Sequence, residues 1–366
     1  MSWRLRIGCL LGAALIAAPV AASAAAQPPA AASDLLYVTS QSGAAVSVID
    51  MQAQEIVATV DLTELGFSPN CKAHDVAVEP DGSHYYVSLI ADWRVLKFDR
   101  DNHLVGQVEF ETPGLLAIDP SGDVLYVGRS MAAVNPPQRI GVIQLSDMGI
   151  EEVDVFFPRP HALAVAPGGG LVYTASLVEN RMATVNPAQD DLELFDVPGD
   201  THTFVQFAVS PDGETLVAGG QISGQILVFD ISDPRAPTLT KTFELGGQPW
   251  HPVFAPDGSI VYFPQRTRNS VAVIDARSWE LVGSIEGDGL AEPHGSAISA
   301  DGRWLWVSGE NTKGTYGKAA EGEMPPGTVV VIDTATRQVV KVIEVPAYGA
   351  GMATRLVQSR SSADAS

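Results

Sequence analysis

The sequence predicts an all-β protein, a seven-bladed β-propeller of four-stranded antiparallel blades closed by a C-terminal strand that joins the first blade. Two observations predict this fold. A phrase made of a strand, a Pro-Asp-Gly turn, a second strand with Tyr-Val, and a third strand ending in Val-Ile-Asp recurs along the chain. The turn residues of successive copies lie 40 to 47 residues apart, at Pro80, Pro120, Pro167, Pro211, Pro256 and Ala300. Such a period is typical of a propeller blade.

Each repeat carries signals for four strands and the turns between them. Runs rich in Val, Ile and Tyr favour strands, and Pro-Asp-Gly favours a tight turn because proline fixes φ and glycine adopts positive φ. The third strand ends at an aspartate that we expect to cap the next turn, and a fourth strand follows, as in EIVATVDL and ELVGSIEG. The aspartates concerned are Asp50, Asp99, Asp230, Asp275 and Asp333. Because one blade cannot bury both of its faces, neighbouring blades should stack into a ring.

The two ends of the repeat region are complementary. The first repeat begins in its second strand, at LLYVTSQSGAAVSVID, whereas a surplus segment, YGAGMATRLVQ, follows the last repeat. Residues 349–358 are therefore expected to supply the innermost strand of the first blade and to close a ring of seven. Six and eight blades are the competing counts.

The segment LLYVTSQSGAAVSVIDMQAQEIVATVDL resembles the YVTN-type β-propeller repeat, and the resemblance covers residues 34–357. It implies the propeller fold and an exported bacterial protein. It leaves the activity open, because the architecture is shared with copper-cluster propellers, amine-dehydrogenase large subunits, haem d1 propellers and lactonases.

The N-terminus has the form of a secretory signal peptide, with Arg4 and Arg6 before an apolar run and small residues at the cleavage options. A membrane anchor would need about 20 apolar residues, and a lipoprotein signal at Cys9 fits poorly because the apolar run follows that cysteine. We therefore predict a periplasmic or secreted protein. Its expected parts are a signal peptide (1–26), a disordered lead-in (27–33), the propeller (34–358) and a disordered tail (359–366).

Composition excludes several classes of function. The chain has 43 acidic and 22 basic residues and a formal charge of −21. This excess repels phosphate backbones and no basic stripe offsets it, so no nucleic-acid partner is expected. The sequence contains no nucleophile elbow and no nucleotide, flavin or covalent haem motif. We expect a monomer without a membrane span.

Histidines gather at one position of the repeat. His74, His161 and His294 lie six residues before the turn residue of their copies, and His251 lies five before. These positions start the innermost strands, which surround one end of the central channel. Neutral imidazoles suit copper or zinc, so these four are the predicted metal ligands, with His202 or Cys71 as auxiliary ligands. The alternative is a structural role, in which each histidine binds the backbone of a neighbouring blade.

The second strands should end on the same face with further polar residues, among them Arg129, Arg266, Glu310 and Gln221. Arginines at the mouth of an acidic protein suggest a small anion as ligand. Two long insertions, SMAAVNPPQRI and ENTKGTYGKAAEGEMPPGT, should overhang this face and suggest a periplasmic protein partner.

Three functions follow from these patterns. The first is an exported propeller that binds copper or another transition metal in the histidine ring. The second is a metal-free interaction scaffold of the periplasm. The third is a lactonase-like hydrolase, because Pro160-His161 and Pro293-His294 are similar to a Pro-His pair in lactonase propellers; Glu310 and Arg266 or Arg129 would then assist the histidine.

Overall fold

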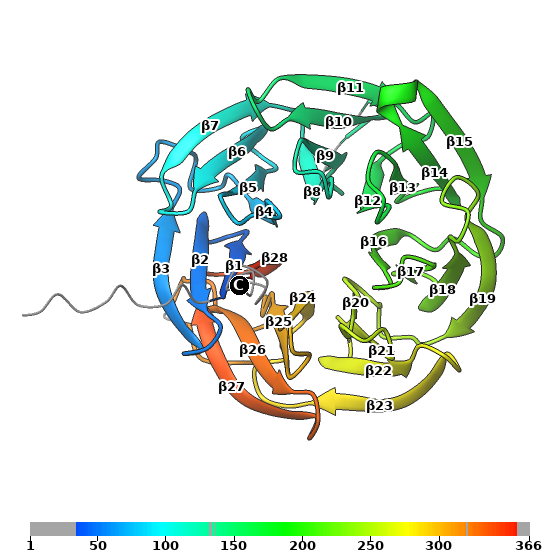
Figure 1. Cartoon of the computed structure of the whole chain (residues 1–366). Coiled ribbons are helices and arrows are strands. Elements are labelled where there is room, and N and C mark those ends of the chain that lie inside the picture. The colour runs from blue at the N-terminus through cyan, green and yellow to red at the C-terminus, as the bar shows by residue number, and fades with distance from the viewer. Residues whose placement is uncertain (1–33, 132–133, 136, 320, 357–366) are drawn as a thin grey trace, which may run out of the picture. The chain divides into compact units, whose positions relative to one another are not determined.

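The computed structural model describes residues 34–131, 134–135, 137–319 and 321–356. These residues form seven four-stranded antiparallel sheets arranged as blades around a central axis (Figure 1). The predicted fold class is therefore confirmed. The predicted signal peptide, lead-in and tail lie outside the described residues.

Blades are numbered 1 to 7 from the N-terminus, and each contains four strands from the axis outward. The innermost strands are β28 (Gly349–Arg355), β4 (Ala73–Val78), β8 (Pro113–Ile118), β12 (Pro160–Val165), β16 (Phe204–Val209), β20 (Val253–Phe254) and β24 (Pro293–Ile298). The second strands are β1 (Leu35–Ser40), β5 (His84–Leu89), β9 (Val124–Arg129), β13 (Val172–Ser176), β17 (Thr215–Gly220), β21 (Ile260–Gln265) and β25 (Trp304–Gly309).

The outer half of each blade follows the same order. The third strands are β2 (Ala45–Asp50), β6 (Arg94–Asp99), β10 (Arg139–Gln144), β14 (Arg181–Asn186), β18 (Gln225–Asp230), β22 (Ser270–Asp275) and β26 (Gly327–Asp333). The outermost strands are β3 (Glu55–Asp61), β7 (Leu104–Glu109), β11 (Ile150–Asp154), β15 (Asp191–Asp196), β19 (Thr238–Glu244), β23 (Glu280–Glu286) and β27 (Gln338–Val345). A short 3-10 helix, η1 (Pro187–Gln189), precedes β15.

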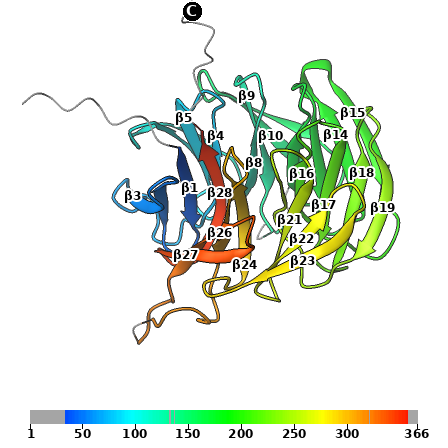
Figure 2. The ribbon, with the colours of Figure 1, turned by 60° about the horizontal axis from the view of Figure 1, so that its bottom comes forward.

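The ring closes through the two ends of the described chain. β28 pairs antiparallel with β1, so that Arg355 lies opposite Leu35 and Gly349 opposite Ser40. Figure 2 shows β28 beside β1. This confirms the prediction that residues near 349–358 complete blade 1.

The turns have the predicted chemistry. In the first Pro-Asp-Gly turn the N–H of Gly82 donates to the carbonyl oxygen of Glu79 (2.8 Å), and Gly82 has a φ of 68°. The carboxylate of Asp275 accepts hydrogen bonds from the backbone N–H groups of Arg277 (3.0 Å) and Ser278 (2.8 Å). The aspartate at the end of a third strand therefore caps the following turn, as expected.

Each pair of neighbouring blades encloses its own buried apolar cluster. One cluster joins Tyr173 of blade 4 to Phe204 of blade 5, and another joins Trp306 of blade 7 to Val38 of blade 1. The remaining five interfaces have equivalent clusters. Burial of each blade depends on both neighbours, so the hydrophobic driving force favours a closed ring.

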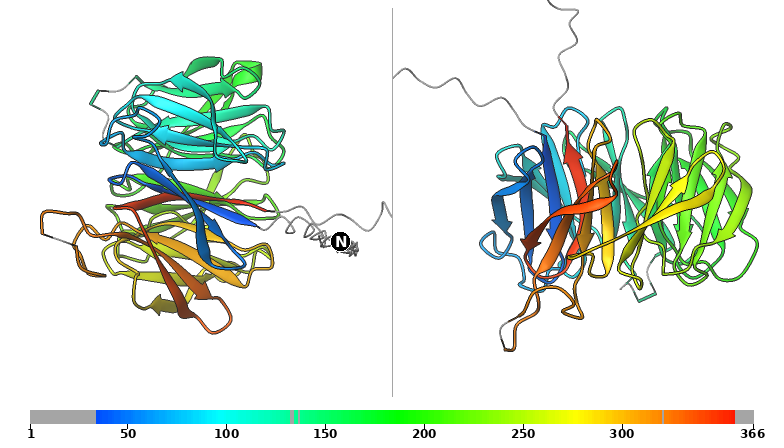
Figure 3. Two further views of the ribbon diagram at one scale, coloured as in Figure 1. Left: turned by 90° about the vertical axis from the view of Figure 1, so that its left-hand side faces the viewer. Right: turned by 90° about the horizontal axis from the view of Figure 1, so that it is seen from below.

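The up-and-down order of the strands gives the ring two different faces. The innermost strands start, and the second strands end, on one face, which we call the loop face. The Pro-Asp-Gly turns lie on the other, the turn face. The long connection between β25 and β26 projects from the loop face (Figure 3), as the sequence predicts.

Candidate functional site

Four histidines converge at the start of the innermost strands. His74, His161 and His294 are the second residues of β4, β12 and β24, and His251 lies two residues before β20. The ring of His294 lies 4.7 Å from that of His251 and 5.9 Å from that of His74, centroid to centroid, and His74 lies 6.0 Å from His161. All four side chains are buried. The structure thus brings together the four predicted primary ligands.

A β-bulge accompanies three of these histidines. The pairing register shifts between Ala73 and Val76 in β4, and similar shifts span His161 in β12 and His294 in β24. A bulge turns side chains away from the regular alternation of a strand. The bulges therefore help to direct the imidazoles toward the axis.

The histidines line a cavity of about 100 Å³ near the loop face. Four of the seven blades contribute a histidine, while Gly114 and Val205 occupy the matching positions in blades 3 and 5. No carboxylate lines the cavity among the described residues. Its lining comprises Gln41, Lys72, His74, Ile90, Ser130, Met131, His161, Val205, Trp250, His251, His294 and Tyr348.

Hydrogen bonds fix the tautomer of three of the imidazoles. Nδ1 of His161 donates to the carbonyl oxygen of Arg129 (2.7 Å), and Nδ1 of His74 donates to the side-chain oxygen of Gln41 (3.0 Å). Nδ1 of His294 donates to Oε1 of Glu310 (3.2 Å). Because these oxygens accept the Nδ1 proton, Nε2 of the neutral ring keeps a lone pair.

The Nε2 atoms of all four histidines are buried and have no hydrogen-bond partner among the residues that the structure describes. Burial lowers the pKa of His161 to about 4 and lowers the pKa values of His74 and His251 well below 6.5; positive charge on neighbouring histidines would lower them further. These three rings are therefore neutral at pH 7. The cavity therefore presents imidazole lone pairs that accept no hydrogen bond from the described residues. Such lone pairs contribute no hydrogen-bond energy to the fold unless a ligand pairs with them.

Glu310 connects His294 to a buried charge network. Its carboxylate accepts two hydrogen bonds from Arg266 (3.0 and 2.5 Å), and Tyr348 also hydrogen-bonds to it. Burial would raise the pKa of Glu310, but the hydrogen bonds and charges of His294 and Arg266 outweigh it and lower the pKa to about 2. Arg266 also lies 3.6 Å from the carboxylate of Glu292. The positive charge of Arg266 is therefore balanced by carboxylates of the protein.

The other two polar residues predicted at the mouth have different positions. The guanidinium of Arg129 is buried inside blade 3, paired with Glu152 (2.8 Å) and stacked 3.8 Å from the Phe110 ring. Only its carbonyl oxygen contributes to the site, through His161. Gln221 is half-buried and does not line the cavity. Neither side chain is placed to bind an anion there.

The two predicted auxiliary ligands also lie outside the cavity lining. Both ring nitrogens of His202 have partners, the hydroxyl of Ser223 (3.1 Å) and the carbonyl oxygen of Pro198 (3.0 Å). Cys71 packs in the apolar cluster between blades 1 and 2, and burial, with the nearby charge of Asp92, raises its thiol pKa to about 11. The structure therefore gives both residues a packing role.

The sequence reasoning missed several residues that border the histidines. Trp250 packs edge-on against His294 at 4.5 Å, and its Nε1 is buried without a partner. Lys72 lines the cavity and forms no ion pair within the described part of the chain. In the sequence Lys72 follows Cys71 and Trp250 precedes His251, and this proximity was the available signal. Both residues lie in connections between blades, where no repeat pattern marks a residue as part of the site.

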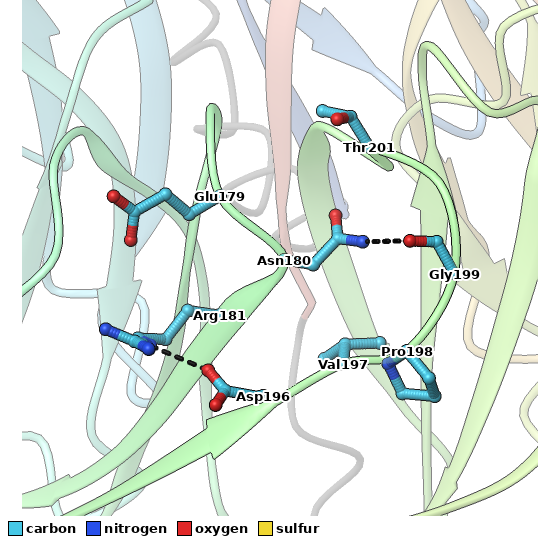
Figure 4. A pocket seen from close by; sticks show the side chains of 8 residues that line it. All are labelled: Glu179, Asn180, Arg181, Asp196, Val197, Pro198, Gly199 and Thr201. Carbon is cyan, nitrogen blue, oxygen red and sulfur yellow. Dashed lines mark hydrogen bonds and ion pairs between the residues drawn. The ribbon is translucent and has the colours of Figure 1, made fainter.

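A larger and more open pocket of about 500 Å³ lies beside His202 on the loop face (Figure 4). Its polar side chains are mostly engaged: Arg181 pairs with Asp196 (2.8 Å), and the Asn180 amide donates to the carbonyl oxygen of Gly199 (3.0 Å). Among the described residues that line it, the carboxylate of Glu179 and the hydroxyl of Thr201 have no such bond. This pocket offers fewer unpaired groups than the histidine cavity.

Within the part of the chain that the structure describes, no group of three or more His, Cys, Asp and Glu side chains is already spaced to hold a metal ion. The histidine rings would have to move together to share one ion. No helix in the described residues is long and apolar enough to span a membrane.

Comparison with known proteins establishes the fold. No family model matches the chain. A protein of unknown function from Desulfotomaculum acetoxidans is similar at 16% identity and a TM-score of 0.72, over 88% of this chain and 99% of that one. A candidate 6-phosphogluconolactonase from Bacteroides fragilis has 15% identity and a TM-score of 0.67, over 90% and 100% of the two chains. A streptogramin B lyase has 14% identity and a TM-score of 0.58, over 75% and 82%. At such identities the likeness concerns architecture, which many activities share.

Proposed function

We propose that this chain is an exported propeller of the YVTN type that binds one transition-metal ion, copper or zinc, in the four-histidine cavity. The observation that supports this best is the set of four buried Nε2 atoms without partners. A buried polar atom without a partner destabilises a protein by about 1–3 kcal/mol, so four around one cavity favour the binding of a ligand there. Imidazole nitrogen is a preferred donor for both metals.

The surroundings of the histidines also support a metal. Metal-bound histidines usually donate their second ring N–H to a carboxylate or carbonyl oxygen, which fixes the ring and its tautomer. Glu310 and the Arg129 carbonyl are such partners for His294 and His161. His251 and His294 have the closest ring centroids, 4.7 Å apart, and the rings of His74 and His161 would have to move toward them to share one ion.

Metal analysis tests this proposal directly. The protein, purified without chelators from copper- or zinc-supplemented cells, should carry about one ion per chain. His74→Ala combined with His294→Ala should abolish binding, whereas the control His202→Ala should retain it, because both nitrogens of His202 are already satisfied. Background metal in the wild-type protein would overturn the proposal.

The geometry also favours a second function, acid–base catalysis at His294. The pair Glu310–His294 resembles a carboxylate that orients a general base, and the free Nε2 faces the cavity. This is the hydrolase hypothesis, but the arginine that it expected is not free, because the charge of Arg266 is balanced by Glu310 and Glu292. A lactone-hydrolysis screen decides it: activity that survives chelation and is lost in His294→Ala would favour catalysis, and an inactive wild-type protein would reject it.

The scaffold hypothesis has its own supporting observation. Among exposed large apolar side chains outside strands, all but Leu356 lie in connections of the loop face: Leu65, Trp93, Val134, Phe156, Val178, Ile222 and Met324. Exposed apolar surface of this kind marks protein interfaces. Replacing Trp93 and Phe156 by serine should abolish capture of a periplasmic partner, while His74→Ala should not; the reverse result would reject the scaffold.

A further inference from the structure

We propose that the four-histidine cavity binds a small anion beside the metal ion. This inference rests on the proposed metal function and names the second ligand of the same site. It follows from three features of the cavity: its charge when a metal is bound, its free hydrogen-bond donors, and its volume.

The protein donors leave a bound cation uncompensated. The four imidazoles contribute no negative charge, and no carboxylate lines the cavity among the described residues. Glu310, the nearest acid in the hydrogen-bond network, already balances Arg266. A divalent ion would therefore leave excess positive charge in a buried site, where uncompensated charge is strongly unfavourable. An exogenous anion removes that excess.

Unpaired donors lie at the same cavity. The indole N–H of Trp250 is buried and has no acceptor within the described part of the chain. Lys72 adds the only ammonium group of the described lining residues, and no ion pair joins it to another described residue. The Gln41 side-chain oxygen accepts from His74, which leaves its NH₂ group as a further donor. Once a metal occupies the histidine lone pairs, the remaining polar groups at the cavity are mainly donors, which anions prefer.

The volume limits the size of the anion. The cavity has a volume of about 100 Å³, and its lining includes the large side chains of Trp250 and Tyr348. A metal ion would occupy part of this space. We therefore assign the second ligand to the class of small monovalent anions, such as azide, nitrite or formate.

This assignment differs from the anion site expected from the sequence. Arg129 and Arg266 were the expected receptors, but both are paired inside the protein. Lys72 takes their place because it lies in the connection that leads into β4, next to the cavity.

Azide titration of the copper(II)-loaded protein tests the inference. Copper content is measured first, and azide binding is then followed by the charge-transfer absorption of the copper–azide complex. We expect a saturable band in the wild-type protein. Lys72→Met should weaken azide binding about tenfold with copper content unchanged, and Lys72→Arg should restore most of the affinity because it keeps the charge. Lys318 is an exposed lysine of the β25–β26 connection. Lys318→Met is therefore the matched control and should bind azide normally.

The two proposals fail in different ways. A wild-type protein that holds neither copper nor zinc overturns the metal function and, with it, this inference. Normal copper content with no azide band, or with equal azide affinity in the wild-type protein and Lys72→Met, overturns the anion site and leaves the metal function standing. Trp250→Phe provides an independent test, because it removes the indole donor while keeping an aromatic ring beside His294, and should weaken azide binding several-fold.

Discussion

The loop face and the turn face both carry polar residues repeated from blade to blade, but only those on the turn face have their hydrogen bonds satisfied within the described residues. On the turn face, Asp275 and its equivalents accept backbone hydrogen bonds within their own turns. On the loop face, the repeated histidines keep four buried Nε2 atoms without partners. Repetition alone therefore does not distinguish a structural residue from a ligand. The hydrogen bonds that each side chain makes do distinguish the two.

The largest effect should come from the carboxylate that supports the site. Glu310→Ala leaves the buried Nδ1–H of His294 and the guanidinium of Arg266 without their main acceptor. Removing one partner of a buried pair costs about 3 kcal/mol or more. Chemical denaturation should show this loss of unfolding free energy, and metal affinity should also fall. A variant as stable as the wild type would contradict the central position given to Glu310.

Two histidines of similar burial should respond in opposite ways. His202→Ala loses two satisfied hydrogen bonds and buried packing, and should cost about 2 kcal/mol of stability in the metal-free protein. His251→Leu replaces a side chain whose Nε2 has no partner, so metal-free stability should stay equal or rise by up to about 1 kcal/mol.

In metal content, the two variants should rank in the opposite order from their stabilities. His251→Leu should lose bound metal, and His202→Ala should keep it. Thermal denaturation of both metal-free variants, together with metal analysis, checks the pair of predictions. A large destabilisation by His251→Leu would assign that residue to the structural class and weaken the contrast between the faces.

The pH dependence of stability should also reveal the buried histidines. Burial holds the pKa of His161 at about 4, below its ordinary value of 6.5. The unfolded chain therefore binds a proton between these pH values while the folded protein does not. Stability from this group is full above pH 6.5 and falls by about 1.4 kcal/mol per pH unit as the pH drops toward 4.

Asp75 acts in the opposite direction over much of that range, because burial raises its pKa to about 7. The measurement is therefore the difference between the wild-type protein and His161→Asn, both metal-free, in denaturation series from pH 4 to 8. The variant should show a smaller loss of stability on acidification. Parallel curves would mean that His161 is protonated in the folded state.

The smallest effect is expected on the turn face. Asp275→Ala removes a side chain that caps one exposed turn, and should lower the free energy of unfolding by less than any of the destabilising changes above, without changing metal content. Asp333→Ala, which removes the same kind of cap in blade 7, should behave alike. A loss of metal in either variant would show that the two faces are coupled.

Much of the fold could be predicted because its determinants are local and repeated. Each Pro-Asp-Gly turn and each Val-Ile-Asp strand end is specified within a few residues, and the incomplete first repeat required a strand from the C-terminus, which β28 supplies. The clustering of His74, His161 and His294, with His251 one residue out of register, was also predictable, because equivalent repeat positions must surround one axis.

The contacts of the remaining site residues were not predictable. Arg129 ends β9 on the expected face, but its guanidinium turns into blade 3 toward Glu152. His202 lies three residues before the repeat position and finds two partners of its own. Trp250 and Lys72 reach the cavity from connections between blades, where no periodic pattern constrains the backbone.

The sequence by itself determined the four-stranded repeat, the closing strand, the turn chemistry and the ring of histidines, because period and local propensity act over short distances along the chain. Only the tertiary structure decided which nitrogen of each histidine is free, which charges are balanced, and how much volume the cavity contains. These properties depend on residues from different blades: Glu310 beside His294, Gln41 beside His74, and the carbonyl of Arg129 beside His161. Such contacts exist only after the ring has closed.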